Sequence, residues 1–401
     1  MSRYFIHPGP GYSAINQVQL IKGGASYFEM MERLLDSAKY VVHLQVYIFD
    51  ADETGHRIIE ALLRAAARQV KVYLLLDAYA SKDFPPGEVE RLRHSGVQFK
   101  WFSPLFRGKG FYVGRRMHHK VLVVDGIYSM VAGLNISNRY NDLPAQPAWL
   151  DWSVFVVGEA SLEILARCRQ LWRKSEFKKE PVSQHPQWYN ELVQAEECLV
   201  RVRVNDWVRA KNQISRSYLE WLYRSQHEVI IMSSYFLPGR VLRKSLAKAA
   251  KRGVRIRLIL ARHSDVGLAK SAENYLYSWL LRQGIEIYEY EKNILHGKVA
   301  VFDAQFATIG SYNVNNISAY ASVELNVDVN NAAFGSTLHK QLNSVLDNDC
   351  MKIEPSSFFQ QLTWWRRFQQ WVSYELVRLI FFLFTFYFTQ AKSTLGKKLD
   401  I

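Results

Sequence analysis

The sequence predicts an α/β protein made of two similar halves, each a mixed, mainly parallel sheet flanked by helices. The halves are expected to pack about a pseudo-twofold axis, with the active site at their interface. Three observations support this fold class: a short motif occurs twice, the order of predicted elements around it occurs twice, and 401 residues are long for one compact core. The hydrophobic fraction of 49% excludes a disordered chain.

In the first half, the predicted elements alternate between strand and helix. A capping-box spacing at Ser26 and Glu29 opens an apolar helix that runs through Leu35. Periodicity and composition then predict strand 40–49, helix 54–68, strand 70–76, helix 88–94 and strand 97–102. The strand–helix–strand order favours parallel strands joined by right-handed crossovers.

The same order returns in the second half. Ala61–Val70 lines up with Ser245–Val254, and Gly96-Val97 lines up with Gly284-Ile285. From Gly to the motif His there are 22 residues in the first copy and 12 in the second, so the first carries an insertion. Its basic and aromatic residues are Phe106, Arg107, Lys109, Phe111, Tyr112, Arg115 and Arg116. The predicted domains are a first half (1–175), a linker (176–190), a second half (191–350) and a C-terminal segment (351–401).

The C-terminal segment is aromatic and basic. Its run 379–388 is apolar except for Thr385 and is too short for a spanning helix, which needs about 20 residues. Trp364 and Trp365 beside Arg366 and Arg367 suit the headgroup layer of a membrane. A helix packed on the protein core is the alternative, because an apolar run without a polar face is covered equally well by protein.

The bulk charge of +14 predicts an acidic partner, and nucleic acid and an anionic membrane surface both fit. Cys168, Cys198 and Cys350 are far apart and show no metal-ligand spacing, so a reduced, cytoplasm-facing compartment is expected. The N-terminal residues contain no apolar run long enough for a signal peptide.

The repeated motif reads HxKxxxxD, with an Asn ten residues after the Asp. It consists of His118, Lys120, Asp125 and Asn135 in the first copy, and of His296, Lys298, Asp303 and Asn313 in the second. In a strand, the His and Lys share a face, whereas the Asp has the opposite parity and is expected to be a structural turn residue. A two-residue turn at Asp125-Gly126 would place Gly133 opposite His118, and the same fold would place Ser311 opposite His296.

Each hairpin therefore offers an imidazole, an ammonium and an amide on one patch, which suits phosphate. Two such patches form a catalytic pair, because a neutral His can attack phosphorus while a protonated His gives a proton to the leaving oxygen. Lys120, Lys298, Asn135 and Asn313 would hold the non-bridging oxygens. Neither a metal nor another cofactor is required, and the carboxylate clusters typical of two-metal sites are not evident.

The twin motifs resemble those of the phospholipase D superfamily, so each half is expected to be phospholipase D-like. Over about residues 16–350 the plan is most similar to bacterial cardiolipin synthases that lack N-terminal transmembrane helices. The resemblance implies a two-step transfer in which His118 forms a phosphohistidine and His296 acts as acid, then base. It also implies a carboxylate downstream of each motif His, where Glu324 matches well and Asp151 more loosely. Gly133, where the second copy has Ser311, departs from the pattern.

The expected function is a phosphatidyltransferase that makes cardiolipin from phosphatidylglycerol and a second phospholipid. Water as acceptor would make the protein a phospholipase D-type hydrolase. A metal-independent nuclease is a further alternative, but the aromatic tail argues against nucleic acid as a partner. A silent membrane scaffold would require loss of motif residues that are present. The expected location is the cytoplasmic side of a bacterial inner membrane, peripheral or monotopic.

Overall fold

The computed structural model describes residues 11–104, 106–107, 110–111, 115–144, 146–172, 198–206, 211–264, 266–315 and 322–396. The predicted linker at 176–190 and the insertion residues Lys109 and Tyr112 lie outside these ranges.

The first sheet is built from residues of the first half. Its strand order is β1-β10-β9-β8-β2-β3-β4. The strands are β1 (Asn16–Lys22), β2 (Val41–Val46), β3 (Lys71–Asp77), β4 (Gln98–Phe102), β8 (Lys120–Val124), β9 (Tyr128–Ala132) and β10 (Trp152–Gly158). Four helices and a 3₁₀ turn accompany them: α1 (Ala25–Ser37), α2 (Glu53–Ala67), α3 (Pro86–His94), α4 (Glu159–Trp172) and η1 (Asn138–Tyr140). The short strands β5 (Phe106–Arg107) and β6 (Gly110–Phe111) pair with each other.

The second sheet has the order β12-β11-β18-β17-β16-β13-β14-β15-β19. Its strands are β11 (Leu199–Asp206), β12 (Lys211–Asn212), β13 (Glu228–Ser233), β14 (Arg255–Ala261), β15 (Glu286–Tyr290), β16 (Lys298–Phe302), β17 (Phe306–Gly310), β18 (Ser322–Asn330) and β19 (Cys350–Lys352). The helices are α6 (Gln213–Arg224), α7 (Arg240–Lys251), α8 (Gly267–Arg282), α10 (Ala332–Asp349), α11 (Pro355–Gln361) and α12 (Trp364–Gly396). A strand of the first half, β7 (Arg116–Met117), joins this sheet beside β18.

The predicted two-sheet α/β architecture is confirmed, but its mainly parallel character is wrong. Among the described strands of the first sheet, only β2–β3 and β3–β4 are parallel neighbours. The equivalent pairs β13–β14 and β14–β15 are parallel in the second sheet. The motif hairpins and the strands beside them add antiparallel pairs, because a tight turn can join only antiparallel strands.

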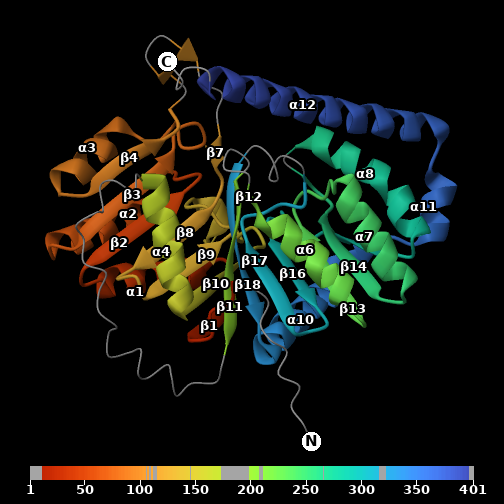
Figure 1. The fold of residues 1–401 in the computed structure, drawn as a ribbon, viewed down its shortest axis with the longest axis horizontal. Helices are drawn as coiled ribbons and strands as arrows, with labels where there is room; N and C mark the ends of the chain where they lie inside the picture. Colours follow the sequence, from red (N-terminus) through yellow and green to blue (C-terminus); the bar gives the residue numbers. More distant parts are fainter. Residues whose placement is uncertain are drawn as a thin grey trace, which may run out of the picture.

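Buried apolar residues form three main clusters that define the layers. One lies between the first sheet and α1, α2 and α3, and another between the second sheet and α6, α7 and α8. The third contains Val121 and Trp152 from the first half together with Val299 and Leu338 from the second. The two sheets lie side by side (Figure 1), and this central cluster joins them.

Helix α1 starts differently from the predicted capping box. It begins at Ala25 after the N-cap residue Gly24, whose φ is 83° and which has no side chain to accept a hydrogen bond. Instead, the carboxylate of Asp142 accepts a hydrogen bond from the Ala25 N–H, at 3.1 Å. Asp142, which is distant in sequence, therefore caps this helix in place of Ser26. The local spacing could not reveal such a partner.

The predicted aromatic segment forms one long helix, α12, which runs beside α8 along one edge of the molecule (Figure 1). Gln370 and Val377, seven residues apart, are buried on its inner side, and Tyr374 packs on Tyr275 of α8 with ring centroids 5.1 Å apart. Its other side exposes large apolar residues: Trp364, Trp365, Phe368, Trp371, Val372, Leu376 and Leu379. None of the helices, searched over the described residues, has the length and apolar character needed to cross a bilayer.

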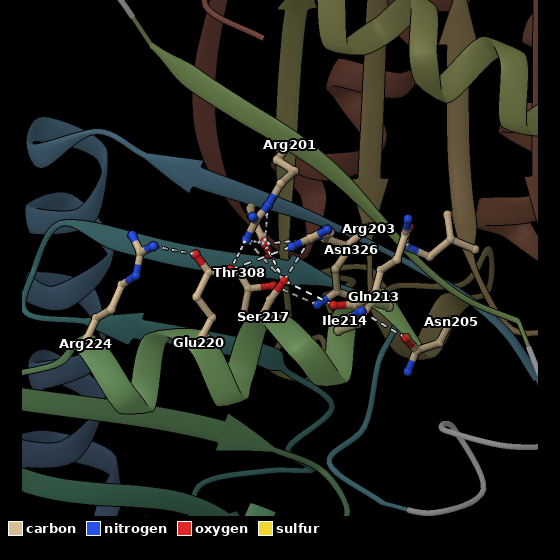
Figure 2. A network of polar contacts seen from close by, with 12 residues as sticks. Arg201, Arg203, Asn205, Gln213, Ile214, Ser217, Glu220, Arg224, Thr308 and Asn326 are labelled. Atoms are coloured by element: carbon tan, nitrogen blue, oxygen red, sulfur yellow. Dashed lines mark hydrogen bonds and ion pairs between the residues drawn. The ribbon is translucent and has the colours of Figure 1, made fainter. Parts of the chain in front are cut away.

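A buried ionic network holds β18 against β11 and α6 (Figure 2). Asp328 on β18 accepts hydrogen bonds from Arg201 at 2.9 Å and from Ser217 at 2.6 Å. Arg203 and Glu220 extend the network towards the surface. Because Glu324 and Asp328 lie four residues apart on the same face of β18, this network also fixes the strand that carries Glu324.

Candidate active site

Both motif hairpins have a three-residue loop. Val124 pairs with Tyr128, and Phe302 pairs with Phe306, so the predicted two-residue turn and its register are wrong by one residue. Asp125 and Gly126 both have positive φ, as do Asp303 and Ala304. The Asp125 carboxylate accepts hydrogen bonds from the N–H groups of residues 39–41, and Asp303 does the same for residues 226–228. Each motif Asp therefore ties its turn to the start of the neighbouring strand.

Each motif His is anchored to the backbone of the other half. The His118 N–H donates to the carbonyl oxygen of Val323 at 3.0 Å, and the His296 N–H donates to that of Leu150 at 2.8 Å. The two imidazoles thereby reach one site at the junction of the sheets. This position could not be read from the strand periodicity of either half alone.

The His118 imidazole is held by a carboxylate on β18. Its Nδ1 lies 3.0 Å from Oε2 of Glu324, which leaves Nε2 as the free ring nitrogen. Glu324 is fully buried, and it accepts hydrogen bonds from the hydroxyl groups of Ser311 and Ser322. Ser311 therefore orients Glu324, the carboxylate that holds His118.

The His296 imidazole is held by Asp151, with Nδ1 2.7 Å from Oδ2. A Cβ atom added to Gly133 would lie only 2.3 Å from that same Oδ2. Gly133 and Ser311 occupy equivalent positions in the two hairpins, so the departure at Gly133 has a steric cause. The shorter Asp151 side chain sits where the second copy has a serine hydroxyl.

The resemblance implied that each carboxylate serves the motif His upstream of it in the same half, and this pairing is wrong. Glu324 of the second half binds His118, and Asp151 of the first half binds His296. Because each motif His hydrogen-bonds to the backbone of the other half, its imidazole meets the carboxylate there, which is Glu324 on β18 for His118 and Asp151, just before β10, for His296. Both predicted carboxylates are thus in the site, with their partners exchanged.

The two motif lysines occupy equivalent places. Both are buried, and the ammonium of each donates to the carbonyl oxygen of the motif His two residues earlier. Lys120 lies over the Tyr47 ring, 5.1 Å from its centroid. At the equivalent place in the other half-site, Lys298 approaches the Ser234 hydroxyl at 3.5 Å. Lys298 also lies 3.6 Å from Asp151.

The two motif asparagines differ. Asn135 accepts a hydrogen bond from the Ile48 N–H and donates to the Tyr140 hydroxyl, so both its oxygen and its nitrogen already have partners. Asn313 lines a cavity beside His118, and its Oδ1 is buried with no hydrogen-bond partner among the described residues. Phosphate binding by these residues remains a prediction, and the geometry favours Asn313.

Aromatic residues that the motif search missed surround both imidazoles. Tyr47 contacts His118 edge to face with ring centroids 4.9 Å apart, and Tyr140 contacts His296 in the same way at 5.0 Å. Trp149 is a further aromatic neighbour of His296, with ring centroids 6.0 Å apart. Tyr47 has Ser234 at the equivalent position of the second half, so the repeat does not mark it, and no sequence signal marks Tyr140 or Trp149.

The electrostatics of the two half-sites differ. Burial lowers the pKa of His118, with Glu324 opposing this shift. Burial and the charges of Lys298 and Lys120 hold the pKa of His296 well below its usual value. Burial raises the pKa of Asp151 to about 6, despite the opposing charge of Lys298.

Burial also lowers the pKa of Lys120 to about 7. Burial alone would raise the pKa of Glu324, but His118, Lys120 and the Ser311 hydrogen bond outweigh it, so this pKa lies below its usual value. The charges of the two lysines, two histidines and two carboxylates therefore act on one another, and an anion bound among them would offset positive charge that burial disfavours.

The cavity beside His118 has a volume of about 380 Å³ and is lined by both polar and apolar residues. The polar ones are Tyr47, Arg116, His118, Tyr235, Asn313, Asn315, Ser322 and Glu324. The apolar ones are Leu237, Val266, Leu268, Ala269, Val377 and Ile380. The last two residues belong to α12, so the C-terminal helix forms part of the wall.

A family model described as "Cardiolipin synthase, PLD-like domain" matches residues 31–151 and 218–349, one segment in each half. The chain belongs to this family. A cardiolipin synthase B from Salmonella typhi is 32% identical over 381 residues, covering 92% of this chain and 89% of the relative. The Escherichia coli K12 protein of the same name is 31% identical, over 90% and 88%.

Solved structures of low sequence identity share the fold. A phosphatidylserine synthase from Haemophilus influenzae superposes with a TM-score of 0.69 at 13% identity, over 92% of this chain and 95% of that one. A polyphosphate kinase from Porphyromonas gingivalis gives a TM-score of 0.56 at 16% identity, over 85% and 49%. At these identities the likeness concerns the fold alone.

In the part of the chain that the structure describes, no group of three or more His, Cys, Asp or Glu side chains is arranged to hold a metal ion.

Proposed function

We propose that the protein is a phosphatidyltransferase that makes cardiolipin from phosphatidylglycerol and a second phospholipid. The observation that carries this proposal is the pair of histidines, each held at Nδ1 by a carboxylate of the other half, in a site with two buried lysines. Membership of the cardiolipin synthase family supports the substrate class.

In the first step, Nε2 of neutral His118 attacks the phosphorus of the donor. The bond from phosphorus to the glycerol oxygen breaks as protonated His296 gives that oxygen its proton, and a phosphatidyl–histidine remains. The lowered pKa of His118 suits the nucleophile, which must be neutral. The pKa of His296 must rise for it to act as an acid, and the anionic substrate supplies the charge that raises it.

In the second step, neutral His296 removes the proton from a hydroxyl of the acceptor, whose oxygen attacks phosphorus. The phosphorus–nitrogen bond to His118 breaks, and His118 becomes neutral again. Lys120, Lys298 and Asn313 stabilise the non-bridging oxygens through both steps, because charge develops there in the transition state.

The cavity supports a lipid as the substrate. It combines polar residues that include His118 with apolar residues from α8, α12, Val266 and Leu237, which matches a phosphodiester joined to acyl chains. A nuclease would be expected to line this approach with Arg and Lys for the phosphate backbone. The apolar lining therefore favours phospholipid over nucleic acid.

The outer side of α12 supports attachment to a membrane surface. Trp365, Phe368 and Trp371 form a contiguous exposed aromatic row, with Arg367 and Arg378 on the same helix. A helix of this kind lies in the interface with its apolar side among the acyl chains. The active-site cavity, which α12 helps to line, would then open close to the substrate.

The test is product analysis by mass spectrometry with phosphatidylglycerol vesicles. We expect release of glycerol and a four-chain lipid, and loss of turnover by at least about a thousandfold in His118→Ala. Wild-type protein quenched during turnover should carry a phosphatidyl group on His118. Phosphatidic acid as sole product would indicate hydrolysis, and a label on His296 would reverse the two roles.

A further inference from the structure

A second polar pocket lies on the opposite side of the α8 N-terminus from the active-site cavity. Its larger part has a volume of about 440 Å³ and is lined by the loop after β14, the first two turns of α8 and the inner side of α12. A neighbouring part of about 370 Å³ extends it towards β19 and α11, and the two share Arg262, Asn274, Arg366 and Gln370. No step of the proposed reaction uses these residues.

The larger part carries positive charge. Arg262, His263, Lys270 and Arg366 line it, and no carboxylate does so among the described residues. Arg262 pairs with Glu291, and Lys270 pairs with Glu273 and Glu289. Arg366 has no ion-pair partner among the described residues, so its guanidinium is available to an external anion.

Two amide side chains that line both parts of the pocket have hydrogen-bonding groups without a partner. Gln370 is 6% exposed, and no hydrogen bond joins its amide to another described residue. Oδ1 of Asn274 is buried without a partner there, but as an acceptor it does not itself bind an anion. The Gln370 amide nitrogen is positioned to donate to a bound ligand.

We propose that this pocket binds the phosphate of an anionic phospholipid headgroup, as a second lipid site outside the active centre. The choice of lipid rests on the proposed seating of α12 in the membrane. An interfacial helix sinks its apolar side about 5–10 Å into the headgroup boundary, which brings its polar side to the level of the phosphates. Arg366 and Gln370 lie on that polar side, opposite Phe368 and Leu379.

The test compares Arg366→Gln with Arg367→Gln in the full chain. Both remove one charge from the same turn of α12, but Arg367 lines neither part of the pocket. Sedimentation with phosphatidylcholine vesicles, with and without phosphatidylglycerol, measures binding. We expect Arg366→Gln to weaken binding to the anionic vesicles at least about tenfold, as for a lost charge-assisted hydrogen bond. Arg367→Gln should weaken it no more than about fivefold, as for diffuse attraction.

Gln370→Glu serves as a second variant, because its carboxylate would repel phosphate without changing the size of the side chain. It should weaken binding to the anionic vesicles at least as much as Arg366→Gln. Equal effects of Arg366→Gln and Arg367→Gln, or normal binding by Gln370→Glu, would overturn the proposal.

Two further measurements separate this site from the active centre and from a free anion. Turnover of a soluble phosphodiester should be unchanged in Arg366→Gln, whereas failure of the proposed function would show as no turnover in either protein. The rise in Tm caused by inorganic phosphate should be the same in wild type and Arg366→Gln. If phosphate no longer raised the Tm of the variant while its vesicle binding stayed normal, the pocket would bind free phosphate and the lipid proposal would be wrong.

Discussion

At the scale of single residues, the two half-sites hold their imidazoles with different side chains. Glu324 reaches His118 and is oriented by the Ser311 hydroxyl, whereas Asp151 reaches His296 through the space left by Gly133. The carboxylate environments differ accordingly, with a lowered pKa for Glu324 and a raised one for Asp151. Different duties for the two histidines are consistent with this asymmetry.

Gly133→Ala should therefore damage the His296 half-site. Its Cβ would lie 2.3 Å from Asp151 Oδ2, so the carboxylate must move away from His296. We expect kcat to fall at least about tenfold and the free energy of unfolding to fall by about 1–3 kcal/mol, as is usual for overpacking. Assay of turnover and denaturant titration measure the two effects.

The double variant Gly133→Ala/Asp151→Ala provides the control. It should be no less stable than Asp151→Ala alone, because the clash is gone, and it should have no activity, because His296 has lost its carboxylate. Wild-type kcat in Gly133→Ala alone would show that the position of Asp151 is unimportant.

Lys120 makes anion binding dependent on pH. Its pKa is lowered to about 7, so the free site loses this charge as pH rises through 7. A bound anion favours the protonated form, and affinity should therefore fall by up to about tenfold per pH unit above 7. Calorimetric titration with sulfate, whose charge is constant in this range, measures the effect.

Lys120→Met should bind sulfate more weakly than wild type and with little pH dependence between pH 7 and 9. If the affinity of this variant for sulfate still fell steeply with rising pH, the pH dependence would come from another group.

At the scale of elements, local patterns predicted the strands and helices that carry the site. The parallel strand pairs, both hairpins and the two-sheet repeat follow from periodicity and turn residues. The register of the hairpins, the cap of α1 by Asp142 and the antiparallel majority do not, because they depend on loop length and on partners distant in sequence. The exchange of Glu324 and Asp151 between halves was hidden for the same reason.

The motif Asp residues should affect stability rather than chemistry. Asp125→Ala removes an acceptor of three backbone hydrogen bonds and places alanine at a φ of 54°. We expect a loss of about 2 kcal/mol in the free energy of unfolding, with kcat of the folded protein within about twofold of wild type. Asp303→Ala should behave alike.

Asp125→Asn gives the comparison, since Asn tolerates positive φ and keeps one acceptor oxygen. Its stability should lie between those of wild type and Asp125→Ala. A hundredfold loss of kcat in a fully folded Asp125→Ala protein would place this residue in the chemistry instead.

At the scale of the whole molecule, the halves are joined by more than a shared site. The central cluster mixes residues of both, Trp152 donates to Gln341 of α10 at 2.8 Å, and β7 pairs with β18 of the second sheet. Each motif His depends on a carboxylate of the other half. Neither half contains a complete pair of imidazole and carboxylate, so the active geometry requires both to be folded.

This dependence predicts that the molecule unfolds as one cooperative unit, because the central cluster cannot persist when either sheet is lost. Scanning calorimetry should show one transition, with calorimetric and van't Hoff enthalpies in agreement. Two variants test this: Ile58→Ala, in the cluster between the first sheet and its helices, and Leu246→Ala, in the corresponding cluster of the second sheet. Both side chains are fully buried. Each should cost about 2–5 kcal/mol and lower the same Tm. Two transitions, each moved by only one of the variants, would show that the halves are stable alone and that their joint site forms only by docking.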